Sequence, residues 1–182
     1  MTTSTAPIAL FTFLDATHRD IQTHLKTLRG LVEAVEQGGL NADQRQQARS
    51  VIAYFNQEAR HHHLDEEKHV FPSLLNSSDA ALVEAGQRLI QDHGWLEETW
   101  LEIEPLMEAV VNDNQWFDPI ELHHAYEVFE GLYADHIVLE EGLAFPGAQK
   151  QSVAWDAEGI GREMAKRRAV KRAAAQQASQ AA

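Results

Sequence analysis

Four long segments with a helical spacing of apolar residues constrain the fold more than any other feature of this chain. Within them, apolar side chains recur at i, i+3, i+4 and i+7, the pattern of one buried helix face. Each segment is longer than an average helix, and no stretch alternates apolar and polar residues convincingly. We therefore predict an all-α fold without strands. The segments cover about residues 8–36, 43–71, 79–110 and 119–144.

Short stretches rich in Gly, Pro, Asn and Ser separate these segments, as expected for loops. Four amphipathic helices joined by short loops predict an up-down-up-down four-helix bundle over residues 1–150. Pro105 predicts a kink or break of the third helix near Glu104. Residues 151–182 are predicted to add a C-terminal helical extension. The separating stretches are EQGGLNAD (36–43), FPSLLNSSD (71–79), VNDNQWFDP (111–119) and FPGAQKQS (145–152).

The composition is that of an acidic globular chain without thiol chemistry. Of 182 residues, 44% are hydrophobic, and 15 Lys and Arg against 28 Asp and Glu give a net charge of −13. This charge argues against nucleic acids and anionic membranes as partners. The lack of Cys excludes disulfides, thiolate metal sites and iron–sulfur clusters. Because we find neither a signal-peptide pattern nor an apolar run of about 20 residues, we expect a cytoplasmic protein.

A histidine interrupts each apolar stripe where an aliphatic residue would be expected. Two of these histidines begin the same pattern, HxxxEExxxFP, and the two copies lie 74 residues apart. The other two histidines lie 75 residues apart, so the chain looks like two copies of one helical hairpin. The four are His18, His62, His93 and His136.

The loop positions predict that these histidines share one layer of the bundle. Residues on two antiparallel helices lie at the same level when they are equally far from the connecting turn. The midpoint of His18 and His62 is residue 40, and that of His93 and His136 falls between residues 114 and 115. The midpoint of His62 and His93 falls between residues 77 and 78. All three midpoints lie in predicted loops.

Two acids complete a candidate metal site. Side chains at i and i+4 of a helix lie about 5–6 Å apart, so His62 with Glu66, and His136 with Glu140, can each chelate a cation. Burying two carboxylates without a compensating charge is very unfavourable. Imidazole and carboxylate suit iron, manganese or zinc, and six ligands suit two octahedral ions bridged by carboxylate and an oxo or hydroxo group. The alternative is a hydrogen-bonded polar layer without metal.

The remaining polar residues allow more than one interpretation. His63 is a candidate seventh ligand, and Glu67 and Glu141 either orient ligands or lie in solvent. Glu97 either forms a third pair with His93 or is a surface acid. Tyr133 either hydrogen-bonds a bound oxygen species or belongs to the core, and His69 lies near the site or at the bundle end. We expect solvent exposure for His61, His24, His123 and His124.

The C-terminal segment is basic. Residues 162–172, REMAKRRAVKR, contain six bases and one acid. They could bind an anionic partner, or they could form an amphipathic helix that docks on the bundle through Ile160, Met164 and Val170. The acidic bulk of the chain favours the docked helix.

The pattern of His18, His62-xxx-Glu66, His93 and His136-xxx-Glu140, with both EExxxFP endings, resembles the hemerythrin-like family, also called the HHE cation-binding domain. The resemblance covers about residues 8–146. It implies a four-helix bundle around a non-haem di-iron centre that carries or reacts with O2, or responds to NO or peroxide. Carried over, the family's ligands fall on the same six residues.

One position departs from the oxygen-carrying members of that family. They have a second histidine one turn along the third helix, where this chain has Glu97. A site richer in carboxylate should favour higher oxidation states and weaken reversible O2 carriage. We therefore expect two irons, rather than manganese or zinc, in a protein that binds or senses O2, NO or peroxide in stress response or iron handling. The alternative is an enzyme that reduces or dismutates peroxide or NO.

Overall fold

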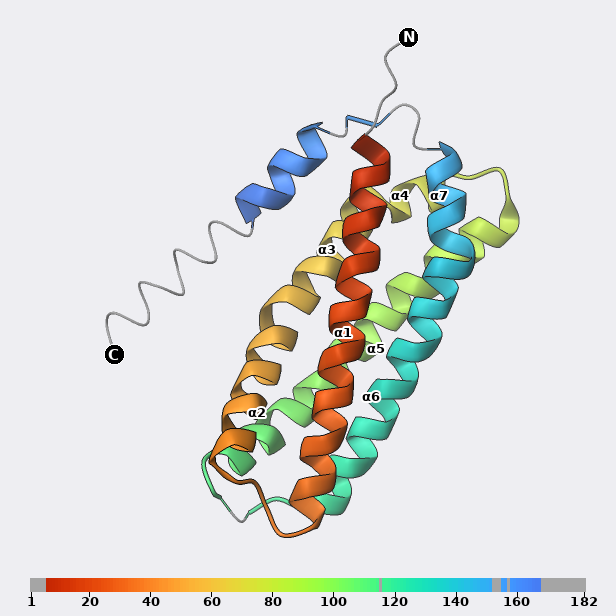
Figure 1. Cartoon of the computed structure of the whole chain (residues 1–182). Coiled ribbons are helices and arrows are strands. Elements are labelled where there is room, and N and C mark those ends of the chain that lie inside the picture. Colours follow the sequence, from red (N-terminus) through yellow and green to blue (C-terminus); the bar gives the residue numbers. More distant parts are fainter. Residues whose placement is uncertain (1–5, 115, 152–154, 157, 168–182) are drawn as a thin grey trace.

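Helices make up nearly all of the part of the chain that the computed structural model describes, residues 6–114, 116–151, 155–156 and 158–167 (Figure 1). Within these residues there is no strand, which confirms the all-α class. The helices are α1 (Ala6–Glu36), α2 (Ala42–Tyr54), η1 (Phe55–Ala59), α3 (Arg60–His69), α4 (Phe71–Leu75), α5 (Ala80–Val111), α6 (Pro119–Leu139), η2 (Glu140–Ala144) and α7 (Phe145–Gln151). A further unlabelled helix covers residues 158–167.

The long helices lie side by side, consistent with a helical bundle (Figure 1). α1 contacts α2 and α6, and α5 contacts both α2 and α6. The loop residues 37–41, 112–114 and 116–118 lie at the lower end in Figure 1, whereas the loop that precedes α5 lies at the upper end. α2, η1 and α3 follow one another as one nearly continuous rod, as do α6, η2 and α7.

Side-chain caps define where the long helices begin. The side-chain oxygens of Asp79 and Asp118 accept backbone N–H bonds at the start of α5 and α6, and Pro119 occupies the first turn of α6. Asn41 and Gln44 form a reciprocal capping box at the start of α2. These caps satisfy backbone donors that have no partner within their own helix.

Two apolar clusters fill the bundle, one on either side of the predicted histidine layer. The cluster nearer the lower loops extends along α1 from Ile21 to Val35 and along α5 from Leu96 to Val111. The other cluster contains Leu10, Phe11 and Leu14 of α1 and reaches Met164 in helix 158–167. The polar layer is therefore enclosed by hydrophobic core above and below.

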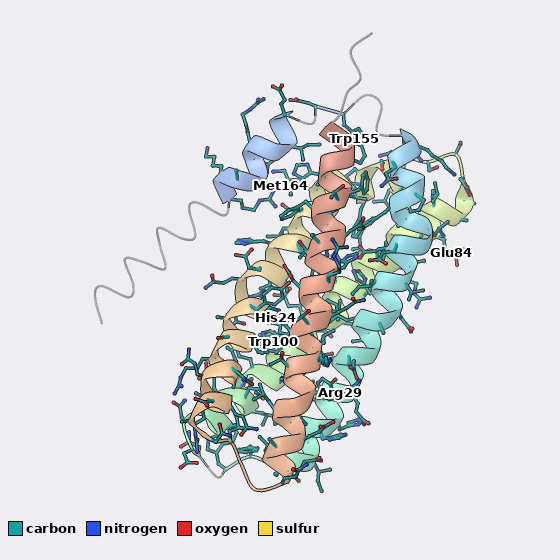
Figure 2. All side chains as sticks on the ribbon, in the orientation of Figure 1. His24, Arg29, Glu84, Trp100, Trp155 and Met164 are labelled. Carbon is teal, nitrogen blue, oxygen red and sulfur yellow. The ribbon has the colours of Figure 1, made fainter. Side chains whose placement is uncertain are left out.

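The C-terminal helix 158–167 lies beside α3 (Figure 1). Met164 is buried, and Ile160 and Trp155 pack on the same apolar cluster; Figure 2 shows Trp155 and Met164 at this end of the bundle. Arg167 contacts the buried Asp65 at 3.1 Å. The docked-helix interpretation is therefore correct as far as residue 167, whereas Val170 and the rest of the basic segment lie outside the described residues.

Two helix boundaries that the prolines predicted are absent. α5 continues through Pro105, so the helix has no break near Glu104, whereas the alternative of a kink stays a prediction. The last long segment does not end at residue 144, because the chain stays helical to Gln151. Just before Pro146 the backbone changes to π-helix, where the Phe145 N–H bonds to the Glu140 carbonyl. Among the described helices, none combines the length and apolar character needed to cross a membrane.

Candidate metal centre

All six predicted ligands converge on one buried layer between the helices. α1 contributes His18, α3 contributes His62 and Glu66, and α5 contributes His93. The last two, His136 and Glu140, come from the junction of α6 and η2. His93 is the most exposed of the six at 5%, so bulk water has almost no access to the layer.

Four of these residues form a first compact group, which consists of His18, His62, Glu66 and Glu140. One ligand atom from each lies within 4.8 Å of the others. The Nε2 atom of His62 is 3.1 Å from a Glu66 oxygen, and the Nε2 atom of His18 is 3.1 Å from a Glu140 oxygen. The His18 ring also packs edge-on to His62 and stacks on Phe145.

A second compact group contains the same two carboxylates together with His93 and His136. The His136 Nε2 atom is 3.2 Å from a Glu140 oxygen, and the His93 Nε2 atom is 3.5 Å from the second oxygen of Glu66. The two Nε2 atoms of these histidines are 3.3 Å apart. Glu66 and Glu140 therefore face both groups, one from each copy of the HxxxE pattern.

Acids on the outer side contact the ring nitrogens that point away from the layer. Glu67 lies 2.8 Å from Nδ1 of His93, and Glu141 lies 2.9 Å from Nδ1 of His18. Each acid follows the glutamate of one HxxxE pair and holds a histidine of a different helix. Such partners fix the orientation and tautomer of a metal-binding imidazole. The orienting interpretation of these two residues is thus supported by their geometry.

Asp92 is a neighbour that the sequence did not single out. It is 4% exposed, and its carboxylate lies 3.8 Å from Nδ1 of His136. In the sequence, Asp92 stands out only because it directly precedes His93. This position does not reveal its contact with His136 on another helix. Asp15 also joins His18 and Glu141 in a more exposed cluster.

Mutual electrostatics keep the two buried carboxylates ionised. Burial raises the pKa of Glu140, but His136 and His18 outweigh it and lower the pKa well below its usual value. The pKa of Glu66 is also lowered, because the nearby histidines outweigh burial and the Glu140 charge. Burial lowers the pKa of His18 and of His136, but the carboxylates raise both to about 10. Burial lowers the pKa of His62 to about 4.

The donor atoms are arranged as they would be around a cation. Within the described part of the chain, none of the four oxygens of Glu66 and Glu140 has a hydrogen-bond partner. Histidine nitrogens nevertheless lie 3.1–3.7 Å from them. Ligands at right angles around an ion, with bonds of about 2.1 Å, are about 3 Å apart. Buried polar atoms that approach one another without hydrogen-bond geometry therefore fit a metal site better than a hydrogen-bonded layer.

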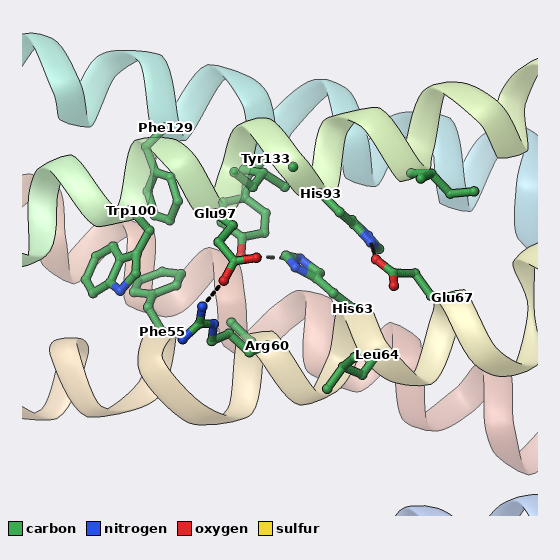
Figure 3. Close-up of a pocket in the computed structure, with 14 residues that line it drawn as sticks. Phe55, Arg60, His63, Leu64, Glu67, His93, Glu97, Trp100, Phe129 and Tyr133 are labelled. Atoms are coloured by element: carbon green, nitrogen blue, oxygen red, sulfur yellow. Dashed lines mark hydrogen bonds and ion pairs between the residues drawn. The ribbon is translucent and has the colours of Figure 1, made fainter.

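A cavity of about 500 Å³ leads from the surface toward this layer between α3, α5 and α6. Its wall includes His93 of the second group, together with His63 and Tyr133 (Figure 3). The Tyr133 hydroxyl is 3.5 Å from Nε2 of His63. At the outer side of the cavity, Arg60 forms an ion pair with Glu97.

The structure also decides the predicted surroundings of Glu97 and His61. Glu97 is half exposed and pairs with Arg60, and it belongs to none of the His and acid groups found among the described residues, so the surface-acid interpretation applies. The solvent position expected for His61 is wrong, since this residue is only 2% exposed. It lies one turn before Asp65 on the face of α3 that helix 158–167 covers.

Three further histidines lie outside the layer. His24 is half-buried rather than fully exposed, and its ring stacks on Tyr54 with centroids 3.7 Å apart. His123 is partly exposed and contacts Glu36, and His124 is exposed as expected. His69 contacts Glu163 of helix 158–167, which places it at the bundle end.

Comparison with known proteins agrees with this geometry. Residues 9–148 match the family model described as the hemerythrin HHE cation binding domain. A chain from Haemophilus influenzae (strain ATCC 51907 / DSM 11121 / KW20 / Rd), which carries the description "Uncharacterized protein", is 28% identical over 158 residues. That alignment covers 87% of this chain and 89% of the relative. The six converging residues all lie inside the matched range.

Proposed function

The chain belongs to the hemerythrin HHE cation-binding domain family, and we propose that it holds a non-haem di-iron centre that binds or senses O2, NO or peroxide in stress response or iron handling. In this proposal the four long helical segments run up-down-up-down around the centre. Imidazole and carboxylate without thiolate suit iron, and manganese or zinc are the less favoured metals. The proposed ligands are His18, His62, Glu66, His93, His136 and Glu140.

The overlap of the two compact groups carries this proposal. Each group offers two imidazoles, and both share the carboxylates of Glu66 and Glu140. Two carboxylates that face both groups suit two cations side by side, whereas a single tetrahedral ion would leave donors unused. A pair of irons with a bridging oxo or hydroxo group would supply open coordination positions and redox electrons.

The protein's own residues would orient the ligands and exclude water. Glu67 and Glu141 would hold the imidazoles of His93 and His18 from outside. Phe145 stacks on the His18 ring, and Phe71 packs against His93, so aromatic side chains shield the ligand layer. The cavity beside His93 would then be the route by which a small molecule reaches the centre.

The cavity also favours a second candidate function, an enzyme that reduces or dismutates peroxide or NO. Tyr133 is fully buried in the inner wall and contacts His63, so a hydroxyl group lies near the position where a ligand would enter. A binding protein needs no such group. Turnover therefore distinguishes the two functions.

Metal analysis of untagged protein, loaded with Fe(II) without oxygen, tests the centre itself. We expect about two irons per chain, with the number reduced in Glu66→Gln and Glu140→Gln. Glu84→Gln, an exposed carboxylate elsewhere on α5, is the control and should keep the iron. A folded wild-type protein that takes up no metal would refute the di-iron proposal.

Titration of the reduced protein with O2, NO or H2O2 tests the reactivity. A stoichiometric absorption change that ends after about one equivalent supports binding or sensing. Consumption of many equivalents of peroxide, or of NO when an external electron donor is present, supports the enzyme. No response to any of the three would contradict both functions.

A further inference from the structure

His63 lies beside the second group of ligands, at the first variable position of the HxxxE pattern of His62 and Glu66. A ring nitrogen of His63 lies within 4.8 Å of ring nitrogens of both His93 and His136. The His63 ring stacks on His93 with centroids 4.0 Å apart and planes at 17°. Its centroid is 5.9 Å from that of His136. Three imidazoles thus surround one side of the layer, and the first group has only two.

Each of these three imidazoles has a polar partner on a neighbouring helix. Glu67 contacts His93, and Asp92 lies near His136. His63 contacts the Tyr133 hydroxyl through Nε2, at 3.5 Å. Metal-binding histidines usually have such a partner on the nitrogen that does not bind the metal. His63 therefore has the environment of a ligand rather than that of a surface histidine.

The position one turn after His93 does not provide this third nitrogen. It is occupied by Glu97, which pairs with Arg60 at the outer side of the cavity (Figure 3). In Figure 3 the His63 ring lies between Glu97 and His93. A third donor for this side of the layer is thus available from α3 instead of α5.

We propose that His63 is a third imidazole ligand for the metal ion held by His93 and His136. This inference rests on the proposed metal centre and makes its two halves unequal. One ion then has three imidazoles and the other has two, with Glu66 and Glu140 shared. Because His63 and His93 both line the cavity, the ion with three imidazoles is the one that an entering molecule meets first.

Chelator competition on the full-length, iron-loaded protein tests this assignment. His63→Leu removes the nitrogen but keeps an apolar side chain of similar size. Since even partners outside the ligand set contribute about 10–100-fold to metal affinity, we expect one of the two irons to bind at least about tenfold more weakly. The other iron should keep the wild-type affinity.

His24→Leu is the matched control. His24 is also a half-buried histidine stacked on an aromatic ring, but it lies outside the ligand layer. It should keep both iron affinities. If His63→Leu binds both irons as tightly as His24→Leu, the assignment of His63 is wrong, while two irons in the wild type would leave the proposed centre intact.

Chemical rescue gives a second test that does not depend on the folding of His63→Leu. In His63→Gly, the truncated side chain opens a space next to the cavity, so added imidazole can enter. We expect imidazole to restore the weakened iron affinity and the absorption spectrum of the wild type. Iron binding in His63→Gly that imidazole leaves unchanged would overturn the proposal.

Discussion

Glu67 and Glu141 show how a single outward-pointing residue can affect a buried layer. Both are about half exposed, yet each lies within 3 Å of a buried histidine nitrogen on another helix. Their side chains connect α3 to α5, and η2 to α1. The repeat of the pattern EE in both helices thus has a structural reason: one acid points inward and the next reaches a neighbouring histidine.

Glu67→Gln and Glu141→Gln should weaken metal binding while the fold stays intact. The amide keeps the size of the side chain but removes the charge that orients the imidazole. We expect a loss of about 10–100-fold in iron affinity for each variant, measured by chelator competition. Glu98→Gln, at another exposed position of α5, should bind iron like the wild type. Unchanged iron affinity in both Glu67→Gln and Glu141→Gln would mean that these acids do not orient ligands.

Gly94→Leu should narrow the cavity that leads to His93. Gly94 lines this cavity, and a Cβ atom added there meets no other atom within 4 Å, so a side chain can start at this position without a clash at its Cβ. We expect slower association of NO or peroxide with the reduced protein in stopped-flow measurements, at unchanged iron content.

Gly131→Leu is the control for this prediction. Gly131 is also a helical glycine with open space around its Cβ position, but it does not line the cavity. Both substitutions raise helix propensity by a similar amount. Equal association rates in the two variants would show that small molecules reach the centre by another route.

At the scale of the elements, two five-residue π-helices lie close to the layer of the six predicted ligands. η1 ends three residues before His62, and η2 begins at Glu140. π-helical turns are rare and occur frequently at functional sites. One of them precedes the first HxxxE pair, and the other begins at the Glu140 of the second pair.

The capping box of α2 predicts a stability change that leaves the metal site untouched. Asn41→Ala removes the side-chain acceptor for the Gln44 N–H at the end of the bundle remote from the ligands. We expect a loss of about 0.5–2 kcal/mol in the free energy of unfolding, measured by urea denaturation of the metal-free protein. Iron stoichiometry should not change; a variant that loses iron would show that α2 and the ligand layer are coupled.

Sequence reasoning located most elements within a residue or two, as for the segment 79–110 against the observed Ala80–Val111. It misplaced the helix boundaries at Pro105 and Pro146, because the chain stays helical through both residues. The π-helix before Pro146 changes the backbone hydrogen-bond register, and such a change has no clear signal in hydrophobic periodicity.

At the scale of the whole molecule, metal removal should destabilise the protein. Two buried carboxylates then depend only on histidines for compensating charge. Binding to the folded state adds about 1.4 kcal/mol for each tenfold excess of metal over its dissociation constant. We expect the melting temperature to fall in chelator and to recover with Fe(II) by differential scanning calorimetry. A melting temperature that is insensitive to metal would argue against a site inside the core.

Removal of residues 152–182 should also destabilise the protein. Without helix 158–167, the apolar cluster around Phe11 loses Met164, and the buried Asp65 loses Arg167. We expect a lower melting temperature in the chain truncated after Gln151. An unchanged melting temperature would instead support a separable extension beyond residue 150.

The six-residue layer could be predicted from the sequence because it depends on two local rules. Helical periodicity decides which side chains face inward, and equal distance from a turn decides which positions share a level. His62 and Glu66 follow from these rules, as do their counterparts 74 residues later. Neither rule requires knowledge of how tightly the helices pack.

Only the tertiary structure decided what surrounds that layer. The contacts of Glu67 with His93 and of Tyr133 with His63 depend on the separation and rotation of helices far apart in the sequence. The burial of His61, on the face of α3 that a helix about 100 residues later covers, has the same origin. Periodicity describes one helix at a time, and it cannot say which neighbour an outward side chain will meet.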